Sequence, residues 1–154
     1  MNIFTQAIDR GNLMYRLGLM ARHWRQVLDA DFQSAGLTDA TWRPLLHLAF
    51  LGDGTRQKDL AASVGIEGPS LVRLLDTLVA KGLIERSEDA TDRRAKLLRL
   101  TSEGREIVER IRETVTVLEG ELLSPFSDGD IVQLAEFIGR LESAVDVARR
   151  RGKR

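Results

Sequence analysis

Three arginine side chains in the middle of the chain could contact a large anion. Arg73 lies on the polar face of a predicted helix, and Arg93 and Arg94 follow one another in a predicted loop. A guanidinium group can donate two parallel hydrogen bonds to the O6 and N7 atoms of guanine in the major groove. It is also attracted to the negative potential of a narrow minor groove. The sequence therefore offers one candidate for base recognition and two for a minor groove.

The helix that carries Arg73 has a well-marked beginning and end. Pro69 suits the first helical position, where its missing N–H makes no difference, so Gly68 is the expected N-cap. Gly82 suits a left-handed position just after the helix. Between them the apolar residues form one stripe: Leu71, Leu74, Leu75, Leu78 and Val79. The opposite face is small or polar: Ser70, Arg73, Asp76, Thr77 and Ala80.

The segments on either side of this helix complete a known motif. Thr55 is the expected cap of a short helix at residues 56–64, and a turn of about four residues leads to the helix of Arg73. After that helix, an extended run at residues 96–100 follows the loop SEDATDRRA and predicts a two-stranded ribbon with a basic tip. Residues 37–100 are therefore predicted to form a winged helix-turn-helix that binds double-stranded DNA.

Longer helices are expected on both sides of this lobe. The first covers residues 6–34, and the second begins after Thr38, although Pro44 removes one of its backbone hydrogen bonds. After the ribbon, Thr101 caps a further long helix. A long terminal helix with a mixed apolar face often packs partly against another subunit.

The last predicted helix carries apolar residues with alternating spacings of three and four. Ser127 and Asp130 mark its beginning, because they have the spacing of a capping box. The seam comprises Ile131, Leu134, Ile138, Leu141, Val145 and Ala148. We therefore expect a mainly α fold with a small β-wing, and a homodimer whose helical dimerisation lobe consists of residues 1–36 and 101–149, with residues 150–154 as a disordered basic tail. A twofold dimer places two recognition helices about one DNA turn, ~34 Å, apart.

Composition narrows the classes of protein. The 154 residues include 23 basic and 23 acidic side chains, so the chain is no polycation that coats nucleic acid. Cysteine is absent, which excludes disulfides, thiolate chemistry and Cys-ligated zinc. No apolar run approaches the ~18 residues of a membrane span. The N-terminus lacks a signal-peptide pattern, so the cytoplasm is the expected location.

Neither catalysis nor a cofactor is expected. The sequence contains no phosphate-binding Gly-rich loop, nucleophile elbow or paired-His motif, and His23 and His47 lack the spacing of a metal site. A different alternative is a winged-helix module that binds another protein and not DNA. The zero net charge favours this alternative, whereas the adjacent arginines of the wing oppose it.

The run GIEGPSLVRLLDTLVAKGLIER, followed by DRRAKLLRLT, resembles the MarR family of bacterial regulators, and most closely its SlyA-like branch. The resemblance is specific over residues 37–101, where it includes Trp42, and it extends to the pairs Trp24-Arg25 and Leu28-Asp29. It implies a dimer that binds palindromic promoter DNA, here predicted to be a repressor. It also implies that a phenolic or aromatic carboxylate ligand releases the DNA, as in many members.

The expected DNA contacts lie on three surfaces. Those in the major groove are Gly68, Pro69, Ser70, Arg73 and Thr77. Those of the wing are Arg86, Asp92, Arg93, Arg94 and Lys96, among which Arg94 resembles the family's minor-groove arginine. Phosphate contacts are expected from Thr55, Gln57 and Lys58. Asp92 either orients Arg94 or ties the loop, and Arg93 either competes for the groove or pairs with Asp76 to brace the wing.

An aromatic carboxylate needs an arginine for its charge and an apolar slot for its ring. Candidates from the first two helices are Arg22, Trp24, Arg25, Trp42, Leu46 and His47. The alternative is that these tryptophans belong to the core and the arginines to the surface.

Overall fold

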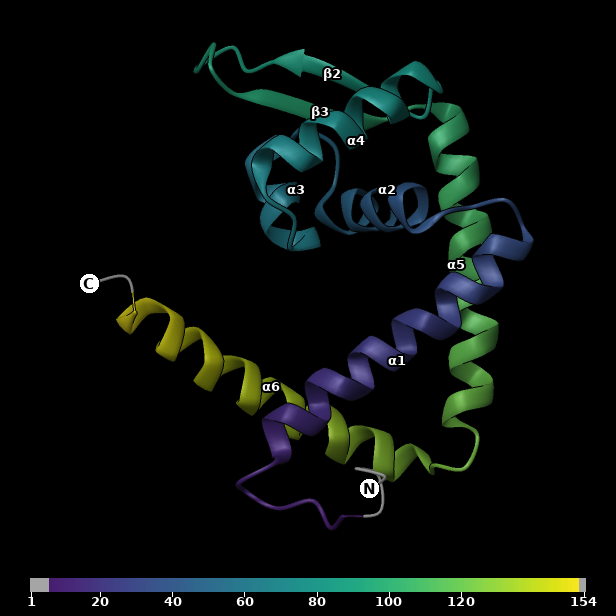
Figure 1. Ribbon diagram of the computed structural model, residues 1–154, viewed down its shortest axis with the longest axis vertical. Coiled ribbons are helices and arrows are strands. Elements are labelled where there is room, and N and C mark those ends of the chain that lie inside the picture. Colours follow the sequence, from purple (N-terminus) through teal and green to yellow (C-terminus); the bar gives the residue numbers. More distant parts are fainter. Residues whose placement is uncertain (1–5, 153–154) are drawn as a thin grey trace. The chain divides into compact units, whose positions relative to one another are not determined.

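The computed structural model describes residues 6–152, which form a mainly α structure with a small antiparallel sheet (Figure 1). In chain order the elements are α1 (Leu13–Ser34), α2 (Asp39–Leu51), β1 (Thr55–Arg56), α3 (Gln57–Val64), α4 (Gly68–Ala80), β2 (Ile84–Glu88), β3 (Lys96–Leu100), α5 (Ser102–Leu123) and α6 (Asp128–Arg151). The predicted fold class is confirmed. The chain divides into two compact units between residues 115 and 116, and each unit is described by itself.

The sheet of the first unit has three strands in the order β1-β3-β2. β2 and β3 pair along their whole length, from Ile84 opposite Leu100 to Glu88 opposite Lys96, so the predicted ribbon is confirmed. The loop between them is the tip of the wing. In Figure 1 this hairpin extends from the three short helices α2, α3 and α4.

The strand β1 was not predicted. Thr55 and Arg56 pair with β3, and the Thr55 hydroxyl donates a hydrogen bond to the carbonyl oxygen of Gly52 at 2.6 Å. The prediction that Thr55 caps the third helix is therefore wrong, and α3 begins at Gln57. The reason is non-local, because the partner strand lies some forty residues further along the chain.

The first two helices differ from their predictions at their beginnings. α1 begins at Leu13 and not at residue 6, because the Asp9 carboxylate accepts hydrogen bonds from the backbone N–H groups of Gly11 and Asn12 at 2.8 and 3.1 Å and holds a turn there. Thr38 precedes α2 as expected, but its side chain caps no backbone group of that helix. Pro44 lies inside α2, as predicted.

The core of the first unit lies between α2, α3, α4, the sheet and the start of α5. Its buried cluster comprises Leu45, Leu48, Leu60, Val64, Leu71, Leu75, Leu78, Leu83, Ile84, Leu98, Leu100 and Val108. α5 approaches this cluster at Gly104, where an added Cβ atom would lie 2.0 Å from the carbonyl oxygen of Leu83. Thr101 caps α5 as predicted, because its hydroxyl oxygen accepts a hydrogen bond from the N–H of Gly104 at 3.0 Å.

The second unit contains the end of α5 and all of α6. Ser127 and Asp130 form the predicted capping box at the start of α6. No residue of α6 is buried, and seam residues such as Leu134 and Ile138 are 47% and 45% exposed. α6 continues to Arg151, so the first two residues of the predicted disordered tail are helical, and residues 153–154 lie outside the described residues. No helix among the described residues is long and apolar enough to cross a membrane.

Candidate nucleic-acid interface

The recognition-helix candidate α4 buries one side and exposes the other. Leu71, Leu75 and Leu78 are at most 1% exposed, whereas Val79, expected in the same stripe, is 39% exposed because it lies at the edge of the buried face. The helix begins at Gly68, so Glu67 and not Gly68 is the N-cap, and Pro69 is the second helical residue. The expected major-groove residues are all exposed: Gly68, Pro69, Ser70, Arg73 and Thr77.

Arg73 occupies the middle of this exposed face. In the described part of the chain its side chain makes no hydrogen bond or ion pair, and it is therefore available to an external acceptor. Thr77 is less available, because its hydroxyl donates to the backbone carbonyl of Arg73 at 3.2 Å. A hollow of about 320 Å³ runs beside Arg73 between α4 and the start of α2, and its polar lining is Thr38, Thr41, Ser70, Arg73, Thr77 and Lys81.

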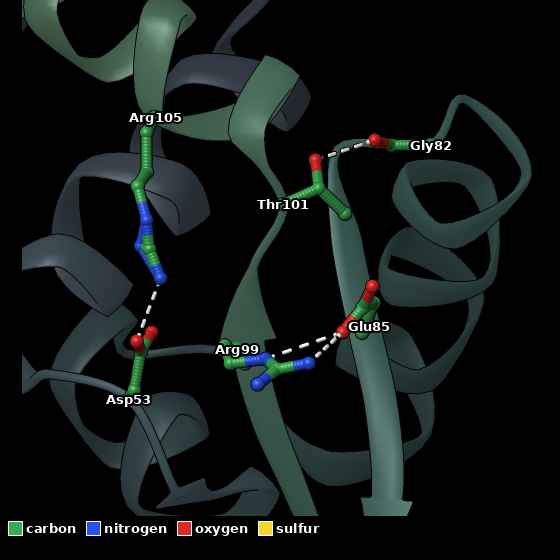
Figure 2. A network of polar contacts seen from close by, with 6 residues as sticks. All are labelled: Asp53, Gly82, Glu85, Arg99, Thr101 and Arg105. Atoms are coloured by element: carbon green, nitrogen blue, oxygen red, sulfur yellow. Dashed lines mark hydrogen bonds and ion pairs between the residues drawn. The ribbon is translucent and has the colours of Figure 1, made fainter.

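The end of α4 is fixed by two hydrogen bonds of a Schellman motif. Gly82, with φ +71°, donates to the carbonyl of Val79 at 2.9 Å, and Leu83 donates to that of Leu78 at 3.0 Å. Thr101 adds a third attachment, because its hydroxyl donates to the Gly82 carbonyl at 2.6 Å (Figure 2). The expected left-handed position at Gly82 is confirmed. The direction in which β2 leaves α4 is thereby fixed.

Two aspartates organise the wing loop. The Asp92 carboxylate accepts a hydrogen bond from the N–H of Arg94 at 3.0 Å, and the Asp92 carbonyl accepts one from the N–H of Ala95 at 2.9 Å. Of the two roles expected for Asp92, the structure therefore shows that it ties the loop. The Asp89 carboxylate accepts the backbone N–H and the hydroxyl of Thr91 at 2.9 and 2.7 Å. These two bonds, with the Arg56 guanidinium 2.8 Å away, lower the pKa of Asp89 to about 2.

The basic side chains around the wing fall into two groups. Arg56 pairs with Asp89, Lys96 with Glu88 at 3.2 Å, and Arg86 with Asp76 at 2.9 Å. The side chains of a second group, Lys58, Arg93 and Arg94, are exposed and form no ion pair among residues 6–152. Of the two alternatives for Arg93, pairing with Asp76 is wrong, because Arg86 from β2 occupies that carboxylate.

A hollow of about 330 Å³ lies between α3, the start of α4 and the wing. Its basic lining is Arg56, Lys58, Arg94 and Lys96, and Gln57 and Asp92 also face it. The structure thus brings the expected wing residues Asp92, Arg94 and Lys96 together with the expected phosphate contacts Gln57 and Lys58. Thr55 does not face this hollow, since its hydroxyl is bonded to Gly52.

Sequence reasoning missed Arg56, Thr41 and Lys81 as lining residues of the two hollows. Arg56 carried no local signal, because it was assigned to a helix and not to a strand. Lys81 and Thr41 follow the helical periodicity of Thr77 and Thr38, so that their faces were predictable once those helices were placed.

The candidate ligand residues do not form one group. Trp42 is 3% exposed, packs against Phe32 with the rings tilted by 43° and their centroids 5.0 Å apart, and its indole N–H donates to the Asp29 carboxylate at 2.8 Å. His47 lies on another face of α2, where its Nδ1 is 2.7 Å from the Ser63 hydroxyl of α3.

Burial, and then the nearby charge of Arg43, lower the pKa of His47. The remaining candidates are a buried Leu46 on α2, a half-buried Trp24 on α1, and the exposed Arg22 and Arg25 of α1. His47 and Trp42 therefore point in different directions from α2: His47 toward α3, and Trp42 toward α1. No group of three or more His, Cys, Asp or Glu residues in the described chain could hold a metal ion.

The chain is similar to a family of known proteins in sequence and in fold. Residues 35–95 match the model of the MarR family. A solved structure described as the transcriptional regulator PA3341 is 34% identical, with a TM-score of 0.77 over 86% of this chain and 96% of that chain. The structure of MarR is 27% identical, with a TM-score of 0.75 over 97% and 100% of the two chains.

A third similar structure contains DNA. It is the MepR–DNA complex of S. aureus, 26% identical, with a TM-score of 0.70 over 86% of this chain and 97% of that chain. The match of the family model covers the helix-turn-helix and most of the wing, and the 34% identity to PA3341 extends over most of both chains. The protein described here belongs to the MarR family of transcriptional regulators.

Proposed function

We propose that this MarR-family regulator binds a pseudo-palindromic DNA operator as a homodimer and represses transcription. The observation that carries the proposal is the distribution of unpaired cations. Arg73 on α4, Lys58 on α3 and Arg94 at the wing tip form no ion pair in the described chain. Three other basic residues of this region, Arg56, Arg86 and Lys96, are paired with carboxylates. Exposed cationic side chains without carboxylate partners are available to DNA phosphates and to acceptor atoms on base edges.

Each of the three cations is suited to a different part of a DNA duplex. Arg73, from the middle of an exposed helix face, is suited to a guanine in the major groove. Arg94, at the end of a narrow two-stranded arm, is suited to the minor groove beside it. Lys58 lines the hollow between α3, the start of α4 and the wing, which is suited to a phosphate of the DNA backbone. The similar MepR structure is a complex with DNA, which supports DNA binding by this fold.

The dimer is supported by the exposed seam of α6. Six apolar residues at heptad-like spacing lie on a helix in which nothing is buried within the chain. An unsatisfied stripe of this kind is stabilised by packing against a second copy of itself or of a neighbouring helix. Two copies then present two α4 helices to successive major-groove faces, about 34 Å apart. A repressor of this kind acts in the cytoplasm, where it occludes a promoter.

We further propose an aromatic carboxylate as the effector. Arg22 and Arg25 on α1 are exposed cations close in sequence to a half-buried Trp24, so α1 offers a charge for the carboxylate and an aromatic surface for the ring. Titrating salicylate against the preformed protein–DNA complex is expected to release the DNA. Arg25→Ala is expected to weaken that release and to leave DNA binding intact, whereas equal release from both proteins removes this part of the proposal.

Footprinting on the promoter region upstream of the protein's own gene tests the central proposal. A homodimeric reader protects two half-sites related by a dyad, with centres one helical turn apart. Sedimentation of the protein–DNA complex is expected to give two chains per operator. The alternative, a winged helix that binds only protein, is favoured by the zero net charge of the chain. It predicts no protected palindrome.

A further inference from the structure

Arg86 lies on β2, in the wing, and its partner Asp76 lies on α4, next to Arg73 in the exposed face. The Arg86 Nη2 atom is 2.9 Å from the Asp76 carboxylate. Within residues 6–152, this is the only ion pair that joins a strand of the wing to α4. The covalent link between the two elements is a turn of three residues, 81–83.

The Arg86 guanidinium is poorly placed to contact DNA directly. Its Nε and Nη2 atoms are buried and form no hydrogen bond, since the approach of Nη2 to the Asp76 carboxylate is an ion pair that lacks hydrogen-bond alignment, and the side chain as a whole is 25% exposed. By contrast, the Arg99 and Glu85 side chains of the neighbouring ion pair on β2 and β3 are 61% and 55% exposed. The carboxylate of Asp76 is therefore the only charged partner of a guanidinium that is largely turned inward among the described residues.

Asp76, unlike Arg86, is well exposed. Its side chain is 59% exposed, on the same face of α4 as Arg73. A carboxylate on a helix that enters a DNA groove is repelled by phosphates, and no other basic side chain of the described chain pairs with it. A carboxylate at this position is explained if its ion pair with Arg86 strengthens DNA binding by more than its negative charge weakens it.

We propose that the Asp76–Arg86 pair is a positioning contact that fixes the wing relative to the recognition helix, so that Arg73 and Arg94 reach their grooves together. This inference rests on the proposed DNA binding. It replaces the expectation that Arg86 contacts DNA and assigns no base contact to Asp76. The two residues act through Arg73 and Arg94.

The direction in which Asp76→Asn changes operator affinity distinguishes a positioning role from a direct electrostatic effect. Asp76→Asn removes a negative charge close to the DNA, so Coulomb attraction alone predicts tighter binding. If the pair positions the wing, Asp76→Asn instead weakens operator binding, by about fivefold for the loss of one partly exposed, geometry-setting contact. Arg86→Gln weakens it by a similar factor, and the double variant loses no more than either single variant.

The experiment measures operator affinity by fluorescence anisotropy for the full-length protein and these variants. Glu85→Gln is the matched control, because it also removes a carboxylate from an ion pair of the same hairpin (Figure 2) but breaks no contact with α4. It is expected to bind as tightly as the unmodified protein or slightly more tightly. Arg94→Ala is expected to lose less affinity in the Asp76→Asn background than alone, because a mispositioned wing contributes less.

Three results overturn the inference: Asp76→Asn binds as tightly as the unmodified protein or more tightly, the two single losses add in the double variant, or Arg94→Ala loses the same factor in both backgrounds. Circular dichroism establishes that each variant is folded. If Arg86→Gln does not fold, Asp76→Asn and its combination with Arg94→Ala still decide the matter. Failure of the unmodified protein to bind any operator contradicts the proposed function instead, and is distinguishable from these outcomes.

Discussion

Replacing Gly104 by alanine should destabilise the protein, although helix propensity predicts the opposite. In the interior of a helix, glycine to alanine stabilises by up to about 1 kcal/mol. Gly104 lies in α5, but its added Cβ would be 2.0 Å from the carbonyl oxygen of Leu83 and 3.4 Å from the Leu100 side chain. The first of these contacts is with backbone, which cannot rotate away.

The magnitude follows from what must move. α5 has to shift by about 1 Å from the α4–β2 turn to reach a normal contact, and this strains the hydrogen bonds from Thr101 to Gly82 and to Leu83, of 2.6 and 3.1 Å. Overpacking of this kind costs about 1–3 kcal/mol, and we expect the upper part of that range. For a chain of this length, 2–3 kcal/mol corresponds to a fall in Tm of about 4–12 °C.

The assay is thermal unfolding followed by circular dichroism, with Gly120→Ala as the matched control. Gly120 lies in the same helix and has no atom within 4 Å of its added Cβ, so alanine there should keep or raise the Tm. A Gly104→Ala protein with an unchanged or raised Tm would refute the reasoning, because it would mean that α5 is not held against the Leu83 carbonyl.

Three further predictions concern the wing, the core and the dimer. The depressed pKa of Asp89 means that its stabilisation of the wing is complete above about pH 4 and is lost as the pH falls toward 2; an NMR titration of this carboxyl with a midpoint near 3.8 would contradict its two hydrogen bonds from Thr91. Trp42→Phe removes the 2.8 Å hydrogen bond to Asp29 and should lower the free energy of unfolding in urea by about 2 kcal/mol; an unchanged midpoint would show that the bond contributes nothing. Ile138→Glu places a charge in the α6 seam and should convert the sedimenting species from dimer to monomer; an unchanged dimer would exclude this seam from the interface.

The elements around α4 were predictable because their signals are local. Pro69 and Gly82 bracket α4 to within one residue, and the period of its leucines gives the buried face. Thr101 and the Ser127–Asp130 pair mark the beginnings of α5 and α6. In each case a side chain or backbone group acts on neighbours three or four positions away, so that the sequence alone contains the interaction.

The parts that were not predicted depend on distant partners. β1 exists because Thr55 and Arg56 pair with β3, and two residues carry no periodicity of their own. The partner of Asp76 is Arg86 and not Arg93, because the alternation of β2 turns Arg86 toward α4. The direction of His47 toward Ser63 is set by the packing of α2 on α3. Composition and spacing select candidates for such contacts, and tertiary packing chooses among them.

The central claim is that Arg73 reads a base, and comparing Arg73→Ala with Arg73→Lys at one operator tests it most directly. Lysine keeps the charge but cannot form the paired hydrogen bonds of a guanidinium to guanine. We predict that both variants lose about 1–3 kcal/mol of operator binding in moderate salt, and that both lose the preference for a G·C pair at one position of each half-site. If both variants instead bind the operator as tightly as the unmodified protein, with that preference intact, Arg73 is not the reading residue and the account is contradicted.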